Sequence, residues 1–164
     1  YKKYNATKVL DPTAGWGGRL LGAINLGIEY IGIDTNVNLK PGYDKLIDLF
    51  DYRSKCKMIY QSALDVDYEA LNYDFVLTSP PYEDVEIYSH MSYQGVDWFY
   101  KEFLIKLIDK VRKYNKGKYT CINISPQMYK KLIGIYEYKP CDITENLSEQ
   151  KNGKTPDNIY IWMD

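Results

Sequence analysis

The strongest chemical signal in the chain is the run Thr78-Ser79-Pro80-Pro81-Tyr82, which directly follows the apolar run 74–77. Those apolar residues predict a buried strand, so the run is expected where that strand ends in a loop. Proline has no backbone N–H and a fixed φ, which predicts a stiff, extended segment with outward-pointing carbonyls and an aromatic ring beyond them. Such a segment could accept hydrogen bonds and stack on a flat ring. An ordinary Pro-Pro turn with a surface tyrosine is the alternative.

A second candidate site is the glycine-rich run 11–19, which lies between the apolar residues 8–10 and a helical pattern over 20–26. This order predicts a strand, a loop and a helix. Gly15 and Gly17 allow positive φ and a close approach of the backbone to a ligand. The helix that follows offers unpaired N–H groups and a partial positive charge. Leu20 stands where the dinucleotide fingerprint has its third glycine, so a nicotinamide cofactor is disfavoured.

Asp34 is the third candidate, because it ends the next apolar run, residues 28–33. Its position is close to the spacing at which an acidic residue meets ribose hydroxyls in nucleotide-binding βαβ units. Two carboxylate oxygens suit a vicinal diol, and a cap on the next segment is the alternative. Parallel strands joined by helices leave their ligand crevice at the carboxyl ends of the strands. All three candidates are therefore expected at one edge of a sheet.

Taken in this order, the two motifs resemble those of the amino-group DNA methyltransferases, which use S-adenosylmethionine. Members of that family place a Gly-rich loop after the first strand and a Ser/Asn/Asp-Pro-Pro-Tyr segment after the fourth. The resemblance covers nearly the whole chain, and its Pro-Pro-Tyr part is the specific piece. It implies an α/β fold of class I methyltransferase type: a single three-layer Rossmann-like domain with a seven-stranded, mostly parallel sheet and an antiparallel terminal strand.

The resemblance also implies roles for individual residues. In the catalytic segment Ser79, Pro80, Pro81 and Tyr82, the Ser79 side chain and the Pro80 carbonyl would accept the two amine protons, and Tyr82 would stack on the target base. Asp11 would meet the amino group of the cofactor. The further cofactor contacts that it implies are Thr13, Ala14, Gly15, Gly17, Asp34, Thr35 and Asp65.

Asp65 is the least typical of these positions, since Ser62-Ala63 stands where the family commonly has Gly-Asp. Ala63 and Leu64 are expected to add backbone contacts there. Arg19 receives no role.

The implied chemistry is methyl transfer to an exocyclic base amine, whose lone pair is delocalised into the ring. Acceptors on both amine protons relocalise that lone pair, and a well-placed hydrogen-bonding group is typically worth about 3 kcal/mol. The target base must leave its stack to reach the site. By resemblance, a serine before Pro-Pro-Tyr favours cytosine N4 slightly over adenine N6. RNA, a protein amide, or a non-catalytic subunit that binds nucleic acid or a partner remain alternatives.

The length and composition of the chain limit how many domains it can form and which partners it can bind. At 164 residues, residues 1–164 are expected to form one catalytic domain without a separate target-recognition domain. Because the chain begins at Tyr1 and not at methionine, an upstream continuation is left open. The net charge of −1 is not the footprint of a domain that grips duplex DNA unaided. The expected partners are therefore nucleic acid, with DNA favoured, and a recognition subunit or missing domain, as in restriction-modification systems.

Metal and membrane partners are not expected. Cys56, Cys121 and Cys141 lack ligand-like spacing, and His90 is the single histidine, so the cysteines read as small core residues. No apolar run approaches the roughly 20 residues of a membrane span, and no signal-peptide pattern begins the chain. We expect a cytoplasmic protein.

The remaining pattern predicts the scaffold. Apolar periodicity marks one helix from Pro41, with Tyr43, Leu46, Ile47 and Phe50 on its buried face, and a longer helix capped by Asp97. The other expected elements are strands at 58–60, 74–78 and 119–124, a short helix from Ser125-Pro126 to Gly134, a strand within 135–143 and a terminal strand at 158–163. The segment 83–95, which carries Glu83, Asp84, Glu86, Tyr88, His90 and Tyr93, is expected to lie over the site as a lid or a surface loop.

Overall fold

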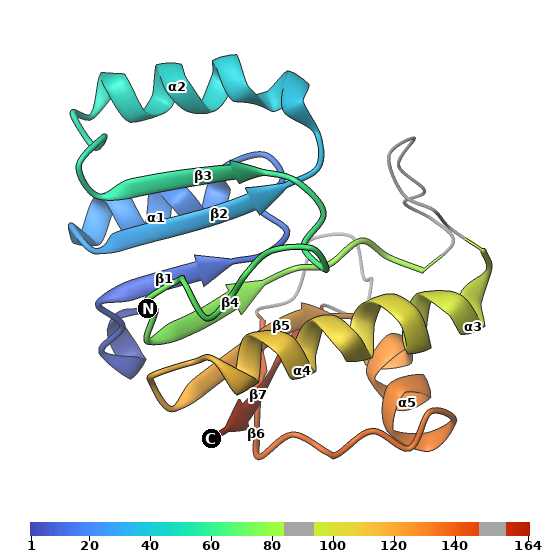
Figure 1. Ribbon diagram of the computed structural model, residues 1–164. Helices are drawn as coiled ribbons and strands as arrows, with labels where there is room; N and C mark the ends of the chain where they lie inside the picture. The colour runs from blue at the N-terminus through green and yellow to red at the C-terminus, as the bar shows by residue number, and fades with distance from the viewer. Residues whose placement is uncertain (84–93, 148–156) are drawn as a thin grey trace.

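The computed structural model describes residues 1–83, 94–147 and 157–164. In these residues the strands form one seven-stranded sheet in the order β3-β2-β1-β4-β5-β7-β6 (Figure 1). The strands are β1 (Lys8–Asp11), β2 (Glu29–Asp34), β3 (Cys56–Tyr60), β4 (Phe75–Thr78), β5 (Tyr119–Ile124), β6 (Ile143–Asn146) and β7 (Asn158–Met163). The pairings from β3 to β5 are parallel, whereas β7 is antiparallel to both β5 and β6. The predicted fold class, including the antiparallel terminal strand, is confirmed.

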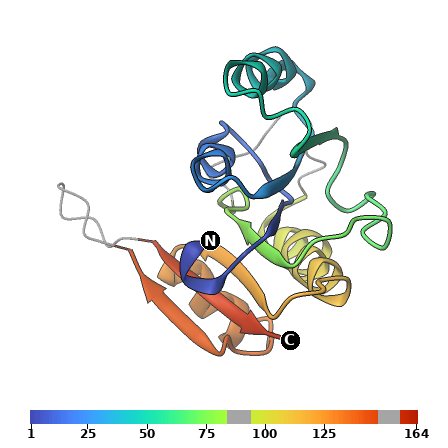
Figure 2. The same ribbon diagram turned by 90° about the vertical axis from the view of Figure 1, so that its left-hand side faces the viewer.

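Helices cover both faces of the sheet and make three layers (Figures 1 and 2). Along β1, Val9 packs with residues of α1 (Gly18–Leu26) and α2 (Lys40–Leu49), while Leu10 packs with residues of α4 (Ile105–Lys113). Successive strand residues point to opposite faces, which accounts for this alternation. Around β5 and β7, a third cluster joins residues of α5 (Pro126–Gly134) to the sheet.

The helix ends follow the local signals in the sequence. Gly17 precedes α1 with φ +84°, and Gly27 follows it with φ +68°, which are left-handed conformations that glycine adopts at little cost. At α5 the Ser125 side chain accepts a hydrogen bond from Met128 N at 3.2 Å, and Pro126 occupies the first turn. The predicted strand-loop-helix unit at the N-terminus and the short helix after β5 are confirmed.

The helix expected to be capped by Asp97 begins differently. It starts with α3 (Val96–Trp98) after Gly95, continues as the π-helical segment η3 (Phe99–Leu104) and then becomes α4. Asp97 therefore lies in the first turn, where it accepts a hydrogen bond from the Tyr136 hydroxyl at 2.7 Å. The wider π turn brings Phe99 onto the buried face, which a regular 3.6-residue period does not predict. The predicted Asp97 cap is wrong.

Two further expectations need correction. The strand expected within 135–143 is β6, and it shares only Ile143 with that range. Residues 136 and 138 are tyrosines that pack on the third core cluster. Their side chains contact the core although this segment is not a strand, and so the apolar pattern there was misleading. Phe50, expected on the buried face of α2, is instead 49% exposed, because the helix ends at Leu49 and Phe50 leaves its stripe.

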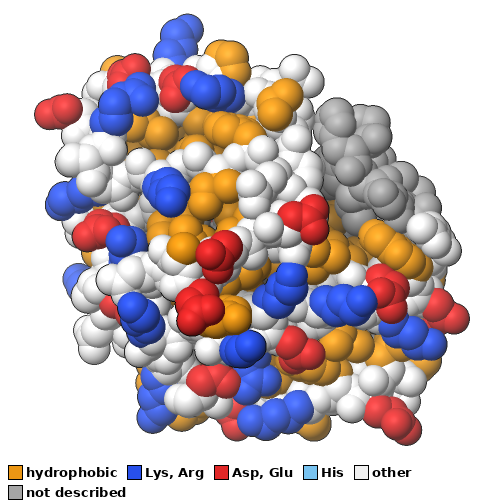
Figure 3. Space-filling model, viewed as in Figure 1, with side chains coloured by type: hydrophobic (Ala, Val, Ile, Leu, Met, Phe, Trp, Pro, Cys, Tyr) orange, Lys and Arg blue, Asp and Glu red, His pale blue; other side chains and the backbone are white. Residues whose placement is uncertain are grey.

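The face of the molecule that carries α4 mixes acidic and basic side chains (Figure 3). Lys106 pairs with Glu102, and Arg112 pairs with Asp164. Lys110 donates to the Leu64 carbonyl, so several cations of this face already have partners. Among the helices in the described part of the chain, none is long and apolar enough to cross a bilayer. Those residues also contain no cluster of histidine, cysteine and acidic side chains that could hold a metal ion.

Candidate active site

The glycine loop between β1 and α1 lies at the carboxyl edge of the sheet, where two hydrogen bonds tie it to β2. Ala14 N donates to the Ile33 carbonyl at 2.9 Å, and Gly15 N donates to Asp34 Oδ2 at 2.8 Å. Gly15 has φ +60°, as the sequence predicts for this position. The Gly15 carbonyl in turn accepts a hydrogen bond from the Tyr43 hydroxyl at 2.9 Å. The loop is therefore held in one shape by β2 and α2.

Asp34 ends β2 directly beside this loop and is half-buried. Its Oδ2 accepts from Gly15 N, and its Oδ1 accepts from Asn36 N at 2.8 Å. A carboxylate offers about four acceptor positions, so each oxygen can take another hydrogen bond. The cap and the ligand-binding interpretations are therefore compatible. Thr35, the next predicted contact, is also half-buried.

Asp11 lies beneath the loop and is fully buried. Its Oδ2 accepts hydrogen bonds from Arg19 Nε at 2.6 Å and from the Tyr30 hydroxyl at 2.7 Å. Its Oδ1 accepts from the Thr78 hydroxyl at 2.9 Å. Burial, followed by the nearby Asp11 charge, raises the pKa of Tyr30 well above its ordinary value, so the hydroxyl keeps its proton as a donor. Asp11 thus joins α1, β2 and β4, and its direct contact with a cofactor stays a prediction.

Arg19, which has no role in the sequence-based hypothesis, is the cationic partner of this buried carboxylate. It also donates to the Thr13 carbonyl, so one guanidinium fixes both Asp11 and the loop above it. A buried charge without a partner is very costly, which explains why an arginine stands there. The signal in the sequence was an arginine in the first turn of the helix that follows an acidic strand end.

Thr13 connects the glycine loop to the catalytic candidate segment. Its backbone N–H donates to Thr78 Oγ1 at 3.1 Å, and its hydroxyl donates to the Ser79 carbonyl at 2.9 Å. The two motifs, which are far apart in sequence, therefore meet at the ends of β1 and β4. Because these strands are hydrogen-bonded neighbours in the sheet, the meeting follows from the topology.

The segment after β4 is held at its far end by two acidic residues. The Tyr82 hydroxyl donates to the Asp157 carboxylate, which immediately precedes β7. Glu83 is 9% exposed, and its carboxylate accepts hydrogen bonds from the Tyr100 hydroxyl and from Lys131 Nζ at 2.6 Å. Ser79 and Pro81 are half-buried, and Pro80 is buried. The segment is consequently fixed by β7, η3 and α5.

The expectation that Glu83 begins a polar segment over the site is wrong for this residue, because Glu83 is buried. Burial beside Lys131 makes it an anchor of the Pro-Pro-Tyr segment instead. The other candidates of that segment, Asp84, Glu86, Tyr88, His90 and Tyr93, lie outside the described residues. Asp157 was also missed, because nothing local in the sequence links it to Tyr82.

The loop after β3 gives weaker support to Asp65, which is exposed. Its backbone N–H donates to the Ser62 carbonyl at 3.0 Å, which makes it part of a turn. The Ala63 carbonyl accepts from the Tyr68 hydroxyl at 2.7 Å, and the Leu64 carbonyl accepts from Lys110. The roles of Asp65, Ala63 and Leu64 stay predictions.

Tyr60 is a candidate that sequence reasoning missed. It is the last residue of β3 and lies opposite Asp34 in the register of β2 and β3. Within the described residues, its buried hydroxyl has no hydrogen-bond partner. Burial, with smaller effects of Asp44 and Asp34, raises the pKa of Tyr60 to about 12, so the hydroxyl remains a donor at neutral pH. An aromatic residue at the carboxyl end of the third strand was the available signal.

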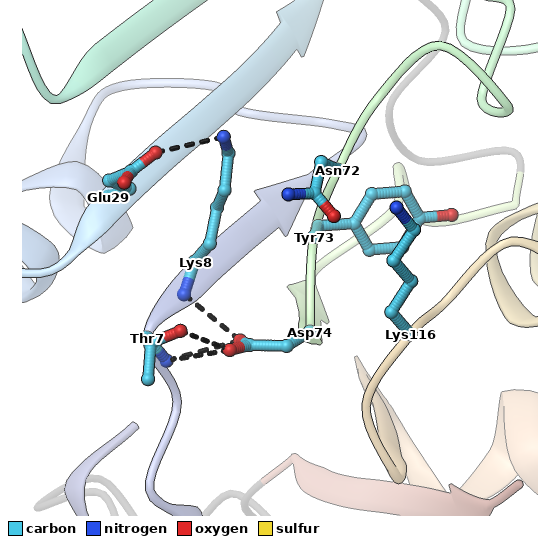
Figure 4. Close-up of a pocket in the computed structure, with 7 residues that line it drawn as sticks. All are labelled: Thr7, Lys8, Glu29, Asn72, Tyr73, Asp74 and Lys116. Carbon is cyan, nitrogen blue, oxygen red and sulfur yellow. Dashed lines mark hydrogen bonds and ion pairs between the residues drawn. The ribbon is translucent and has the colours of Figure 1, made fainter.

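A polar hollow of about 160 Å³ lies at the opposite, amino edge of the sheet (Figure 4). Most of its polar groups bind one another: Lys8 Nζ pairs with Glu29 at 2.8 Å, and the Asp74 carboxylate accepts from the backbone N–H groups of Lys8 at 2.9 Å and of Thr7 at 3.1 Å. These contacts hold together the starts of β1, β2 and β4. The hollow therefore has a structural explanation and is separate from the candidate site.

Comparison with solved structures agrees with the fold described above. An rRNA methylase from Streptococcus thermophilus aligns with 97% of this chain and 88% of its own, with a TM-score of 0.65 and 12% identity. The human methyltransferase 10 domain-containing protein aligns with 94% of this chain and 70% of its own, with a TM-score of 0.61 and 14% identity. The chain has the class I methyltransferase fold.

At such low identities the likeness concerns the fold. A third example is the methyltransferase domain of a bacterial Hen1 protein, which aligns with 99% of this chain and 92% of its own at a TM-score of 0.63 and 13% identity. No protein-family model matches the sequence, and no curated protein matches it either.

Proposed function

We propose that the chain is an S-adenosylmethionine-dependent methyltransferase that acts on an exocyclic amine of a nucleobase. The observation that carries the proposal is the hydrogen bond from the Thr13 hydroxyl to the Ser79 carbonyl at 2.9 Å. It brings a glycine loop suited to a cofactor against a Ser-Pro-Pro-Tyr segment suited to a planar amine. The methyltransferase fold of the chain supports the same reaction class.

The residues at the ends of β1 and β2 fit this cofactor. Asp34 has acceptor capacity for the two ribose hydroxyls, and the neighbouring Tyr60 hydroxyl is an unpaired donor among the described residues. Gly15 and Gly17 let the loop backbone approach a ligand closely. When bound, S-adenosylmethionine supplies an electrophilic methyl group. Asp11 and Arg19 keep the loop in place from below and are positioning residues in this account.

The segment after β4 fits the amine. The Ser79 side chain and the Pro80 carbonyl accept the amine protons, which favours a pyramidal nitrogen with a localised lone pair. Tyr82 stacks on the base, and its ring is oriented by the hydroxyl contact to Asp157. Pro81 and the anchored Glu83 keep the backbone rigid, so little reorganisation is needed at the moment of transfer.

DNA is the favoured substrate because of the Ser-Pro-Pro-Tyr segment, with cytosine N4 slightly ahead of adenine N6. RNA is the second candidate, and the similarity in fold to an rRNA methylase favours it. A net charge of −1 suggests that a recognition subunit or a further domain contributes to nucleic acid binding.

The test uses tritium-labelled S-adenosylmethionine with unmethylated genomic DNA fragments and with RNA transcripts, followed by mass spectrometry of the nucleosides. The expected result is an N-methylated base in one of the two nucleic acids, with transfer lost in Tyr82→Ala. A chain that binds the cofactor but methylates neither nucleic acid contradicts the proposal and favours a non-catalytic subunit or a protein substrate.

A further inference from the structure

Two buried side-chain atoms lack a hydrogen-bond partner in the described part of the chain: the Tyr60 hydroxyl and Asn123 Oδ1. Both residues stand at the carboxyl edge of the sheet, Tyr60 as the last residue of β3 and Asn123 as the next-to-last residue of β5. Leaving a buried acceptor unpaired is unfavourable, and such groups are rare. Their position at the ligand-binding edge indicates that they serve a ligand. Tyr60 lies beside Asp34, where we expect the cofactor. Asn123 lies farther along the same edge, where we expect the substrate.

Asn123 lies beside the catalytic candidate segment. In the parallel pairing of β4 with β5, Leu77 is opposite Cys121 and Thr78 is opposite Ile122. Asn123 is the next residue of β5, and Ser79 is the first residue after β4. Leu77 and Cys121 pack in the same core cluster, and strand alternation places Asn123 on the face of Cys121. The Asn123 side chain therefore lies on the sheet face next to the start of the Ser-Pro-Pro-Tyr segment.

The other neighbour of Asn123 also belongs to the site. Asn123 pairs with Ile159 of β7, two residues after Asp157, and Asp157 binds the Tyr82 hydroxyl. Asn123 is thus flanked by the two chain segments that hold Ser79 and Tyr82. Its unpaired carbonyl oxygen therefore lies near the segment that we expect to bind the amine.

We propose that Asn123 recognises the substrate, with Oδ1 accepting a hydrogen bond from one N–H of the target amine, which the Ser79 side chain or the Pro80 carbonyl also accepts. The inference rests on the proposed function and adds a specificity-determining residue to it. The amide is uncharged, so its oxygen can accept a hydrogen bond from an N–H group without repelling the phosphates of a nucleic acid. The donor is the target amine, because the ring nitrogens of neutral cytosine and adenine in a nucleic acid carry no hydrogen.

The test compares Asn123→Leu with Asn115→Leu. Asn115 lies before the opposite end of β5, where its side chain is fully engaged: Nδ2 donates to the Tyr119 carbonyl at 3.0 Å, and Oδ1 accepts from Gly117 N at 3.0 Å. Each variant is assayed for its Tm, for its Kd for S-adenosylmethionine, and for kcat/KM on the DNA fragments and RNA transcripts that serve as substrates.

If Asn123 serves the substrate, Asn123→Leu raises Tm by about 2–4 °C, because it removes an unpaired buried acceptor. The same change lowers kcat/KM about tenfold and leaves the Kd for the cofactor unchanged. Asn115→Leu does the reverse, lowering Tm and leaving kcat/KM unchanged. A residue that only supports the fold would not combine a gain in stability with a loss of activity.

Three results overturn the inference. Full kcat/KM in Asn123→Leu, with a wild-type chain that transfers methyl groups, refutes the role of Asn123 alone and leaves the proposed function standing. Absence of transfer by the wild-type chain refutes both. A lowered Tm in Asn123→Leu also contradicts the inference, since it means that the amide stabilises the folded protein.

Discussion

The Thr13 hydroxyl donates a hydrogen bond to the Ser79 carbonyl at 2.9 Å and joins segments that are 66 positions apart. One end of this contact belongs to the proposed cofactor loop, and the other begins the proposed catalytic segment. A shift of one motif should therefore shift the other, because the Thr13 side chain connects them. Several measurable consequences depend on this connection and on the anchors around it.

The Thr13 contact should affect both halves of the site. In Thr13→Ala the loop and the Ser79 carbonyl lose their shared bond, so we expect cofactor affinity and methyl transfer each to fall about fivefold, as for a net loss near 1 kcal/mol. Thr13→Ser keeps the hydroxyl and should restore both. Calorimetry and the radiolabel assay measure the two effects, and an alanine variant that changes neither would show that the contact is incidental.

The buried pair of Asp11 and Arg19 should be important for stability. Arg19→Met leaves the fully buried carboxylate without its cation, so the free energy of unfolding should fall by about 3 kcal/mol. Arg53→Met is the matched control, because Arg53 pairs with Asp48 at the surface and should change stability by less than about 1 kcal/mol. Urea unfolding measures both. Equal effects in the two variants would mean that the Asp11 pair has no special role.

Tyr82 should separate substrate binding from cofactor binding. In Tyr82→Ala the stacking surface is lost, which should reduce methyl transfer at least tenfold, since stacking contributes roughly 1–3 kcal/mol per base. Cofactor affinity should stay near that of the wild type. Tyr82→Phe keeps the ring but loses the contact to Asp157, so a smaller loss is expected. A large drop in cofactor affinity in the alanine variant is incompatible with the stacking role.

The thiols of Cys56, which is half-buried, and of Cys121, which is buried, should react slowly at neutral pH. Burial raises the pKa of Cys56 to about 11 and that of Cys121 to about 12, from an ordinary value of 9.0. The folded state thus favours the neutral thiols, and this contribution to stability is complete below about pH 9 and is lost as pH rises toward 11 to 12. At pH 8, iodoacetamide should label both at least tenfold more slowly in the native chain than in urea, by peptide mass spectrometry. Native labelling as fast as in urea would exclude this burial.

Much of the fold could be predicted because its signals are local. Gly17 and Gly27 bound α1 through their own backbone conformations, and Ser125-Pro126 starts α5 through a side-chain cap. The runs that form β1, β2 and β5 are mostly buried, and each contains a short apolar stretch that marks it as a strand. The loop and segment at the ends of β1 and β4 could also be placed together, since both follow strands of one parallel sheet.

The rest depended on contacts between distant residues. Nothing near Asp157 in sequence indicates that it binds Tyr82, and Glu83 is recognisable as an anchor only once Lys131 and Tyr100 are packed beside it. The π-helical turn in η3 shifts the buried stripe in a way that a regular helical period does not anticipate. Strand β6 is short and half-exposed, so its pattern was weaker than that of the aromatic residues before it.

A calorimetric titration of the chain with S-adenosylmethionine, using Asp34→Ala and the control Asp48→Ala, tests the proposed cofactor site most directly. Asp48 is a surface acid of α2 that pairs with Arg53, so its loss should leave the affinity unchanged. We expect saturable binding by the wild type and at least a tenfold loss in Asp34→Ala. At 100 times the dissociation constant, the cofactor should also stabilise the wild type by about 2.7 kcal/mol. No binding by the folded wild type, or equal affinity in Asp34→Ala, would contradict the proposed site.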